Sequence, residues 1–214
     1  MPATIAPSLT VVDLSRRFGP ISLRRIRFDP EPGTATEQDV LDIHQREKRL
    51  FELVDGILVE KTIGFMESVL AAALCGRVAT WVSKRNLGAV AGADGMMRLA
   101  PGLIRIPDVS FMEWDRFPNR QIQVDPIPDL VPDLAVEVLS PSNTELEMEG
   151  KLNDYFRTGT RLVWYVDPRT RTVDVYTAPD QSIRLTQADT LDGGSLLPGF
   201  RLPLRELFAE LDPH

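Results

Sequence analysis

The segment that most constrains the fold is "VPDLAVEVLSPSN", residues 131–143. Its centre is a run of apolar strand-forming residues, and Glu137 lies among them between Val136 and Val138. Apolar residues that continue along a strand predict that the strand is covered on both faces. A carboxylate in such a strand must be neutralised, paired or bound to a metal, because an unpaired buried charge is costly. The chain must therefore form a covered sheet and supply a partner for Glu137.

Strands and helices are predicted on both sides of this run. Asp55-Gly56 is a hairpin signal between two short strands in "FELVDGILVEK", and Thr36 has the character of a helix N-cap. Further helices are predicted over residues 66–86 and 145–158 and near the C-terminus, and strands over residues 88–93, 95–100, 106–112, 133–140, 161–167, 172–178 and 182–187. This mixed order predicts an α/β or α+β layer fold around one sheet.

The chain is predicted to hold one domain. Residues 1–35 have Gly and Pro at short intervals, which predicts an irregular N-terminal arm that packs on the domain or on a partner chain. Residues 36–214 form the single domain, with a polar, Pro-rich loop at 113–132. Neither a Gly-rich phosphate loop nor a GxSxG elbow occurs in the sequence.

Composition limits the kinds of partner that the chain can bind. The formal net charge is -7, which argues against broad non-specific nucleic-acid binding and favours cation binding where carboxylates converge. Cys75 is the one cysteine, which excludes an internal disulfide framework and fits a reducing compartment. The sequence shows no signal-peptide pattern and no apolar run of roughly 18 residues. We therefore expect a cytoplasmic protein that does not enter a membrane.

Three charged residues are candidates for chemistry. Asp108 opens a predicted strand, Glu137 lies within another, and Lys151 lies on the helix predicted from Glu145, where it is expected to face the sheet together with Leu146 and Tyr155. Two carboxylates on adjacent strands suit a hard divalent cation such as Mg²⁺, which takes oxygen ligands. Such a cation polarises a phosphodiester and lowers the pKa of a bound water. The lysine would orient that water or stabilise the negative charge of the transition state.

Each of the three residues also has a simpler interpretation. Asp108 follows a proline and is typical of a strand end or turn. Glu137 alone is compatible with a charge on a solvent-facing surface, and Lys151 alone with an ordinary surface lysine. Their order along the chain is what favours a shared site.

The motifs resemble those of a known family. "IPDVSFM" and "PDLAVEVLSPSN…GKLNDYFRTGTRLVWYVDP" are similar to the restriction endonuclease family of the Uma type, within the PD-(D/E)XK nuclease superfamily, over roughly residues 36–210. The resemblance implies a central mixed four-stranded sheet flanked by helices, with added β-hairpins. It implies that Asp108 is the PD aspartate and Glu137 the second acid.

The chain departs from the superfamily pattern at one position. The lysine usually stands two residues after the acid, where this chain has Leu139. In the Uma-type branch the resemblance implies that the lysine has moved to the following helix, as Lys151. An acidic residue on the first core helix is also common in the superfamily. Glu67 is the candidate for it, and Glu52 is the weaker alternative.

Three functions remain open on the sequence. The first is an endonuclease that hydrolyses DNA with Mg²⁺, or alternatively Mn²⁺, and acts as a homodimer because two copies can cut both strands of a duplex. The second is a non-catalytic relative that keeps the fold for binding or assembly. The third is a nuclease that acts on RNA.

Overall fold

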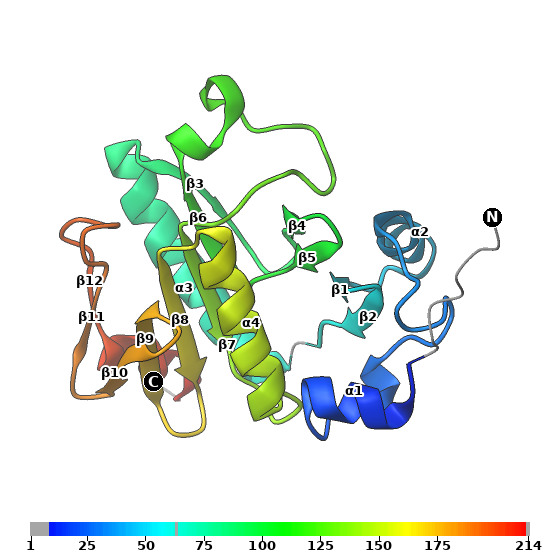
Figure 1. Ribbon diagram of the computed structural model, residues 1–214. Helices are drawn as coiled ribbons and strands as arrows, with labels where there is room; N and C mark the ends of the chain where they lie inside the picture. The colour runs from blue at the N-terminus through cyan, green and yellow to red at the C-terminus, as the bar shows by residue number, and fades with distance from the viewer. Residues whose placement is uncertain (1–8, 63, 213–214) are drawn as a thin grey trace.

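The computed structural model describes residues 9–62 and 64–212. Its centre is a mixed six-stranded sheet in the order β10-β9-β8-β7-β6-β3 (Figure 1). The strands are β3 (Gly88–Ala91), β6 (Val109–Glu113), β7 (Leu134–Val138), β8 (Leu162–Asp167), β9 (Thr172–Ala178) and β10 (Gln181–Thr186). β7 and β8 are parallel, and the other neighbouring pairs in this sheet are antiparallel. The predicted fold class is confirmed: β3, β6, β7 and β8 form a mixed centre that the β9–β10 hairpin extends.

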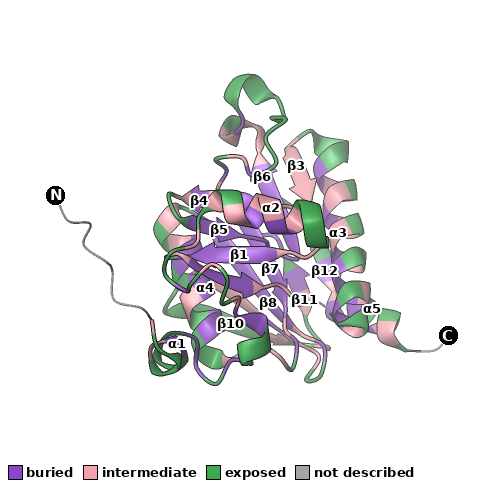
Figure 2. Cartoon of the chain, turned by 90° about the vertical axis from the view of Figure 1, so that its right-hand side faces the viewer, coloured by how far each residue is buried: buried purple, intermediate pink, exposed green. Residues whose placement is uncertain are grey.

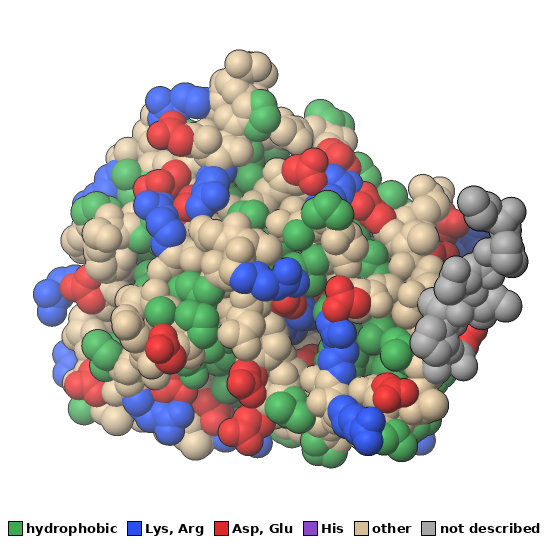
Figure 3. Space-filling model, in the orientation of Figure 1, with side chains coloured by type: hydrophobic (Ala, Val, Ile, Leu, Met, Phe, Trp, Pro, Cys, Tyr) green, Lys and Arg blue, Asp and Glu red, His purple; other side chains and the backbone are tan. Residues whose placement is uncertain are grey.

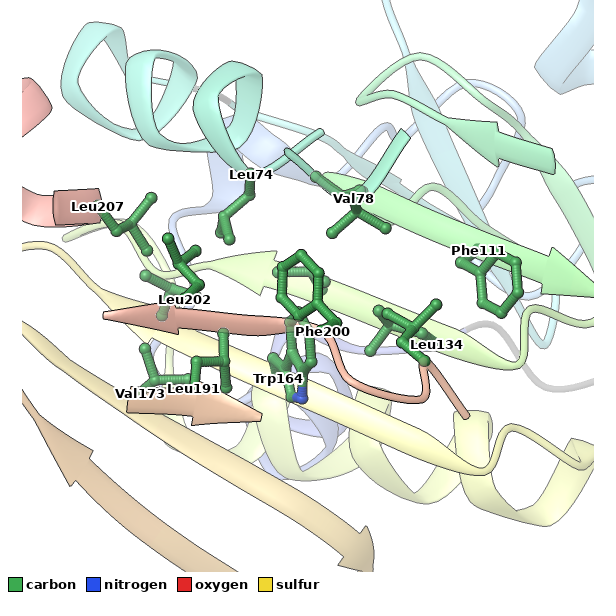
Figure 4. Packing of buried hydrophobic residues seen from close by; sticks show 14 of the residues in the cluster. Leu74, Val78, Phe111, Leu134, Trp164, Val173, Leu191, Phe200, Leu202 and Leu207 are labelled. Atoms are coloured by element: carbon green, nitrogen blue, oxygen red, sulfur yellow. The ribbon is translucent and has the colours of Figure 1, made fainter. Parts of the chain in front are cut away.

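Helices cover both faces of the central sheet. α3 (Phe65–Arg85) lies on one face and α4 (Glu145–Thr158) on the other. Leu134, Val136 and Val138 of β7 belong to the apolar cluster beneath α3, part of which is drawn in Figure 4. Successive side chains of a strand point to opposite faces, so the two residues between them face α4. The strand is therefore covered on both sides, as its apolar run predicts.

α3 begins and ends within one residue of the helix predicted over residues 66–86, but its high hydropathy was not expected from the sequence. Among the described residues it is the one helix long and apolar enough to cross a bilayer by length and composition. Leu70, Leu74, Val78 and Val82 of this helix are buried against the central sheet. Core helices meet the same criterion, and this packing accounts for the apolar composition of α3.

A second, four-stranded sheet lies beside the first, in the order β2-β1-β5-β4. Its strands are β1 (Phe51–Val54), β2 (Ile57–Glu60), β4 (Met97–Ala100) and β5 (Leu103–Arg105). The predicted hairpin is confirmed, with positive φ at Asp55 (48°) and Gly56 (73°) as a two-residue turn of this kind requires. β5 was not predicted, because three residues are too few to show a period.

The two faces of β1 have different neighbours. Phe51 and Leu53 pack in a cluster with residues of α2 (Glu37–Glu47), the helix that the capping box of Thr36 begins, as predicted. Glu52 lies between them and points to the other side, toward α4. Figure 2 shows β1, β5 and β7 as buried strands in the middle of the molecule. Charged residues on the inner face of the second sheet thus lie deep inside the protein.

The N-terminal arm is not irregular throughout, so that prediction was wrong. α1 (Val11–Phe18) is a helix that begins with a capping box between Thr10 and Asp13. Phe18 is buried in the cluster that α4 shares, and its carbonyl accepts a hydrogen bond from the Thr144 hydroxyl. The arm thus packs on α4 of its own chain. Its first eight residues lie outside the described part, and the boundary at residue 36 stays a prediction.

The remaining elements lie in the N-terminal arm, in the long loop and near the C-terminus. They are the 3₁₀ helices η1 (Leu23–Arg25), η2 (Trp114–Arg116), η3 (Pro118–Arg120) and η4 (Ala209–Leu211), the pair β11 (Thr190–Asp192) and β12 (Arg201–Pro203), and α5 (Leu204–Phe208). The predicted C-terminal helix is confirmed, whereas the β11–β12 pair was not predicted. Leu146 of α4 was expected to face the sheet, but it is 43% exposed. It lies five residues before Lys151, and at about 3.6 residues per turn this puts it on another side of the helix.

Candidate active site

The strand register brings Asp108 and Glu137 together. Val109 of β6 is paired with Val136 of β7, so the same register places Asp108, one residue before β6, beside Glu137. The Asp108 amide donates to the Val136 carbonyl at 2.9 Å, and the Val138 amide donates to Asp108 Oδ2 at 2.6 Å. Both side chains lie on the face of the sheet that α4 covers.

Lys151 lies on α4 directly over this pair. Its Nζ is 3.3 Å from each Glu137 carboxylate oxygen and 3.0 Å from Glu52 Oε1. Its side chain is only 5% exposed, so it is not the surface lysine of the simpler interpretation. The structure therefore brings together Asp108, Glu137 and Lys151, as the sequence predicted, although their catalytic roles stay predictions.

A second lysine, Lys61, was missed in the sequence. Its Nζ lies 2.8 Å from Asp108 Oδ1 and 3.9 Å from Glu137 Oε2, and it donates to the Ile106 carbonyl. Lys61 directly follows β2, and a lysine at the end of a hairpin strand is typical of a solvent-exposed position. The only signal in the sequence was its place at the end of "ILVEK", which does not distinguish a buried lysine from an exposed one.

Glu52 joins the site from the second sheet. Its carboxylate accepts hydrogen bonds from Arg105 Nη1 at 2.8 Å and from the Ile106 amide at 3.2 Å. Arg105 also donates through Nε to Asp154 of α4 at 3.1 Å. Burial alone would raise the pKa of Glu52, but Lys151 and Arg105 outweigh it and lower this pKa to about 2. Glu52 was the weaker alternative for the acidic residue of the first core helix. It lies on β1 instead, and it contacts Lys151.

Glu67, the preferred candidate for that acid, has other neighbours. It is buried in the first turn of α3, and its carboxylate packs against Gly64. Among the described residues, no ion pair or hydrogen bond is found between Glu67 and Asp108, Glu137 or Lys151. The structure thus shows no direct polar contact between Glu67 and the cluster, and the role of Glu67 stays a prediction.

Burial governs the protonation of the cluster. It raises the pKa of Glu137, and Lys151 and Lys61 only partly oppose this effect. Burial lowers the pKa of Lys151, but Glu137 and Glu52 outweigh it, so the net direction is upward and the ammonium stays charged. Tyr155 of α4 donates its hydroxyl to Glu137 Oε1 at 2.6 Å, and burial raises its pKa well above the usual value. Tyr155 therefore positions Glu137 as a neutral donor.

The donor atoms fit a hard divalent cation. Asp108 Oδ1, Glu137 Oε2 and the Ile106 carbonyl all lie around one point, and oxygen ligands of these kinds suit Mg²⁺. That point holds the Lys61 ammonium. Within the described residues, no group of three or more acidic, His or Cys side chains is arranged to hold a metal, so two carboxylates and a carbonyl are the ligands that the chain offers here.

Comparisons with known proteins show the fold and the family of this chain. Among solved structures, the chain is similar to the "Crystal structure of a putative nuclease belonging to DUF820" from Anabaena variabilis ATCC 29413, with a TM-score of 0.68 and 20% identity. The match covers 77% of this chain and 92% of the other. No curated protein matches the chain. At this identity the likeness shows the fold alone, and it is the restriction-endonuclease-like fold that the resemblance implied.

The family follows from the sequence match. Residues 37–205 match the family model Uma2, described as "Putative restriction endonuclease". The chain belongs to this family, as the resemblance implied. Family and fold together support a nuclease whose substrate is a nucleic acid and whose relatives generally use a divalent metal.

Proposed function

We propose that this chain is an endonuclease that hydrolyses DNA phosphodiester bonds with Mg²⁺. The observation that carries the proposal is the convergence of Asp108 and Glu137 beside the ammonium of Lys151, all in one buried cluster. The description of the family as restriction endonucleases favours DNA over RNA. The proposal extends to Mn²⁺, which accepts the same oxygen ligands.

Each side chain has a distinct part in the proposed mechanism. The cation supplies polarisation of the scissile phosphate and a lower pKa for the attacking water. Asp108 and Glu137 hold it through their carboxylate oxygens. Lys151 keeps its proton and places a positive charge beside Glu137, where negative charge develops on the attacked phosphate. Tyr155 fixes Glu137 through its hydroxyl, and Glu52 fixes the Lys151 ammonium.

Surface charge agrees with local rather than broad DNA contact. The net charge is -7, and Figure 3 shows acidic and basic side chains mixed over the visible face. A protein of this charge gains little from long-range attraction to phosphates. We propose that DNA is held mainly by groups near the site. Because few basic side chains then contact phosphates, DNA binding should depend only weakly on salt concentration.

Cleavage of supercoiled plasmid tests the function. Wild type with Mg²⁺ is expected to convert the plasmid to nicked and linear forms, and excess EDTA is expected to stop it. Asp108→Asn keeps the shape of the side chain but removes a metal-ligating charge, so its rate should fall on the order of 10²–10³-fold. Equal cleavage by this variant, or cleavage in EDTA, contradicts the proposal. Cleavage of RNA but not of DNA would instead identify the chain as a nuclease that acts on RNA.

We further propose that the chain acts as a cytoplasmic homodimer. Two copies related by a two-fold axis are the simplest way to cut both strands of a duplex, and such dimers are the commonest oligomers. Light scattering at micromolar concentration is expected to give twice the chain mass of 23.9 kDa. A monomeric mass under the conditions in which both strands are cut contradicts the dimer.

A further inference from the structure

The Lys61 ammonium is surrounded by oxygen atoms from β7 and from the segment that leads into β6. Asp108 Oδ1 lies at 2.8 Å, Glu137 Oε2 at 3.9 Å, and the Ile106 carbonyl is a third acceptor. The side chain of Lys61 is only 5% exposed. A long, flexible side chain loses rotamer entropy when it is buried, and burying its charge is costly unless it is paired. Its position is therefore set by these acceptors.

The two lysines of the cluster are held differently. Lys151 sits on a helix, contacts Glu137 and is anchored by Glu52, which Arg105 in turn holds. Lys61 contacts the two carboxylates that the proposed function assigns to the metal. An ammonium and a divalent cation cannot share one set of acceptors, because like charges a few ångströms apart repel strongly in a buried site.

We propose that Lys61 occupies the cation position and that a divalent ion binds by displacing its ammonium. This inference rests on the proposed function, since it takes Asp108 and Glu137 as the metal ligands. Lys61 is then an internal competitor: it neutralises the carboxylates in the metal-free protein and sets the metal concentration at which the site fills.

The contacts around residue 61 indicate how the Lys61 ammonium leaves the two carboxylates. Its backbone amide donates to the Leu50 carbonyl at 2.9 Å, and Arg25 donates through Nε and Nη2 to the Glu60 carbonyl at 3.1 Å. The neighbouring Thr62 hydroxyl lies 2.9 Å from the hydroxyl of Ser142. The backbone at Lys61 and just before it is thus held by hydrogen bonds, and Thr62 is held through its side chain. Displacement therefore proceeds by rotation of the four-carbon side chain rather than by movement of the strand.

Metal binding without any substrate tests the inference. Binding of Mn²⁺ to metal-free protein is followed by the loss of the free-ion paramagnetic resonance signal, for wild type, Lys61→Met and the exposed control Lys84→Met. A nearby charge shifts the proton affinity of a carboxylate by 1–3 units, so removing Lys61 should tighten Mn²⁺ binding roughly tenfold or more. Lys84→Met should bind as wild type does. In melting curves, Lys61→Met should be less stable than wild type without metal and gain more from saturating Mn²⁺.

Amine labelling of the wild type gives a second measurement that does not depend on a variant folding. Lys61 should react slowly with an amine reagent in metal-free protein and faster with saturating Mg²⁺, whereas labelling of Lys84 should not change. Unchanged labelling of Lys61, or equal or weaker Mn²⁺ binding by Lys61→Met than by wild type, overturns the inference and leaves the metal-dependent function standing. No metal binding by either protein overturns both.

Discussion

Replacing Lys151 by methionine is expected to lower the rate of Mg²⁺-dependent DNA cleavage on the order of 10²–10³-fold, the usual loss for one electrostatic contact to a transition state. The Lys151 ammonium lies 3.3 Å from Glu137 and is kept charged by Glu137 and Glu52. Methionine has a similar length without the charge, so the substitution removes the electrostatic contribution while it fills most of the volume. Single-turnover plasmid cleavage measures the effect on the chemical step.

Two further variants make this result specific. Glu137→Gln should lose cleavage and also bind Mn²⁺ more weakly, whereas Lys151→Met should lose cleavage without weaker metal binding, because it removes a cation and not a ligand. The exposed Lys84→Met should cleave as wild type does. Because Lys151 is buried, its removal also lowers stability, so circular dichroism must show that the variant is folded at the assay temperature. Cleavage by folded Lys151→Met at the wild-type rate would return Lys151 to a structural role.

The main features of the central sheet could be predicted because one local pattern determines them. The unbroken apolar run around Glu137 indicated a strand covered on both faces, and the alternation of side chains then put Glu137 on the opposite face from Val136 and Val138. Lys151 and Tyr155 lie four residues apart on a helix and therefore share a face. These rules put Lys151 and Glu137 on facing surfaces, and their order along the chain together with the family resemblance led to the expectation that they meet.

The second half of the cluster could not be predicted in this way. Glu52 meets Arg105 only because β1 pairs with β5, with Leu53 opposite Ile104. Pairing between distant short strands is not encoded in any local period, and β5 was itself too short to recognise. Lys61 was missed for the same reason, since its burial depends on the second sheet lying against β6 and β7. In α1, by contrast, the Thr10–Asp13 capping box was a readable signal.

The largest effect on stability is expected for Arg105→Met. Arg105 is 3% exposed and joins Glu52 of the second sheet to Asp154 of α4. Removing it leaves two buried carboxylates short of a partner, and breaking one such buried pair typically costs about 3–5 kcal/mol. Arg157 also pairs with Asp154, but its side chain is 55% exposed. Arg157→Met should therefore cost at most about 1 kcal/mol. Urea unfolding at neutral pH compares the two variants with wild type.

The pH dependence of the Arg105→Met defect identifies its cause. In wild type, the pKa of Glu52 is lowered from 4.5 to about 2, so the stability that its charge contributes is fully present above pH 4.5 and is lost as the pH falls toward 2. Without Arg105 this pKa rises, and the variant has less of that contribution to lose. Its deficit in unfolding free energy should therefore be largest at neutral pH and shrink as the pH falls below 4.5, whereas a deficit that came only from lost packing would not change with pH. A deficit that stays constant from pH 7 to pH 3 would show that Arg105 supports the fold through its bulk, and that the charged cluster between the two sheets contributes little to holding them together.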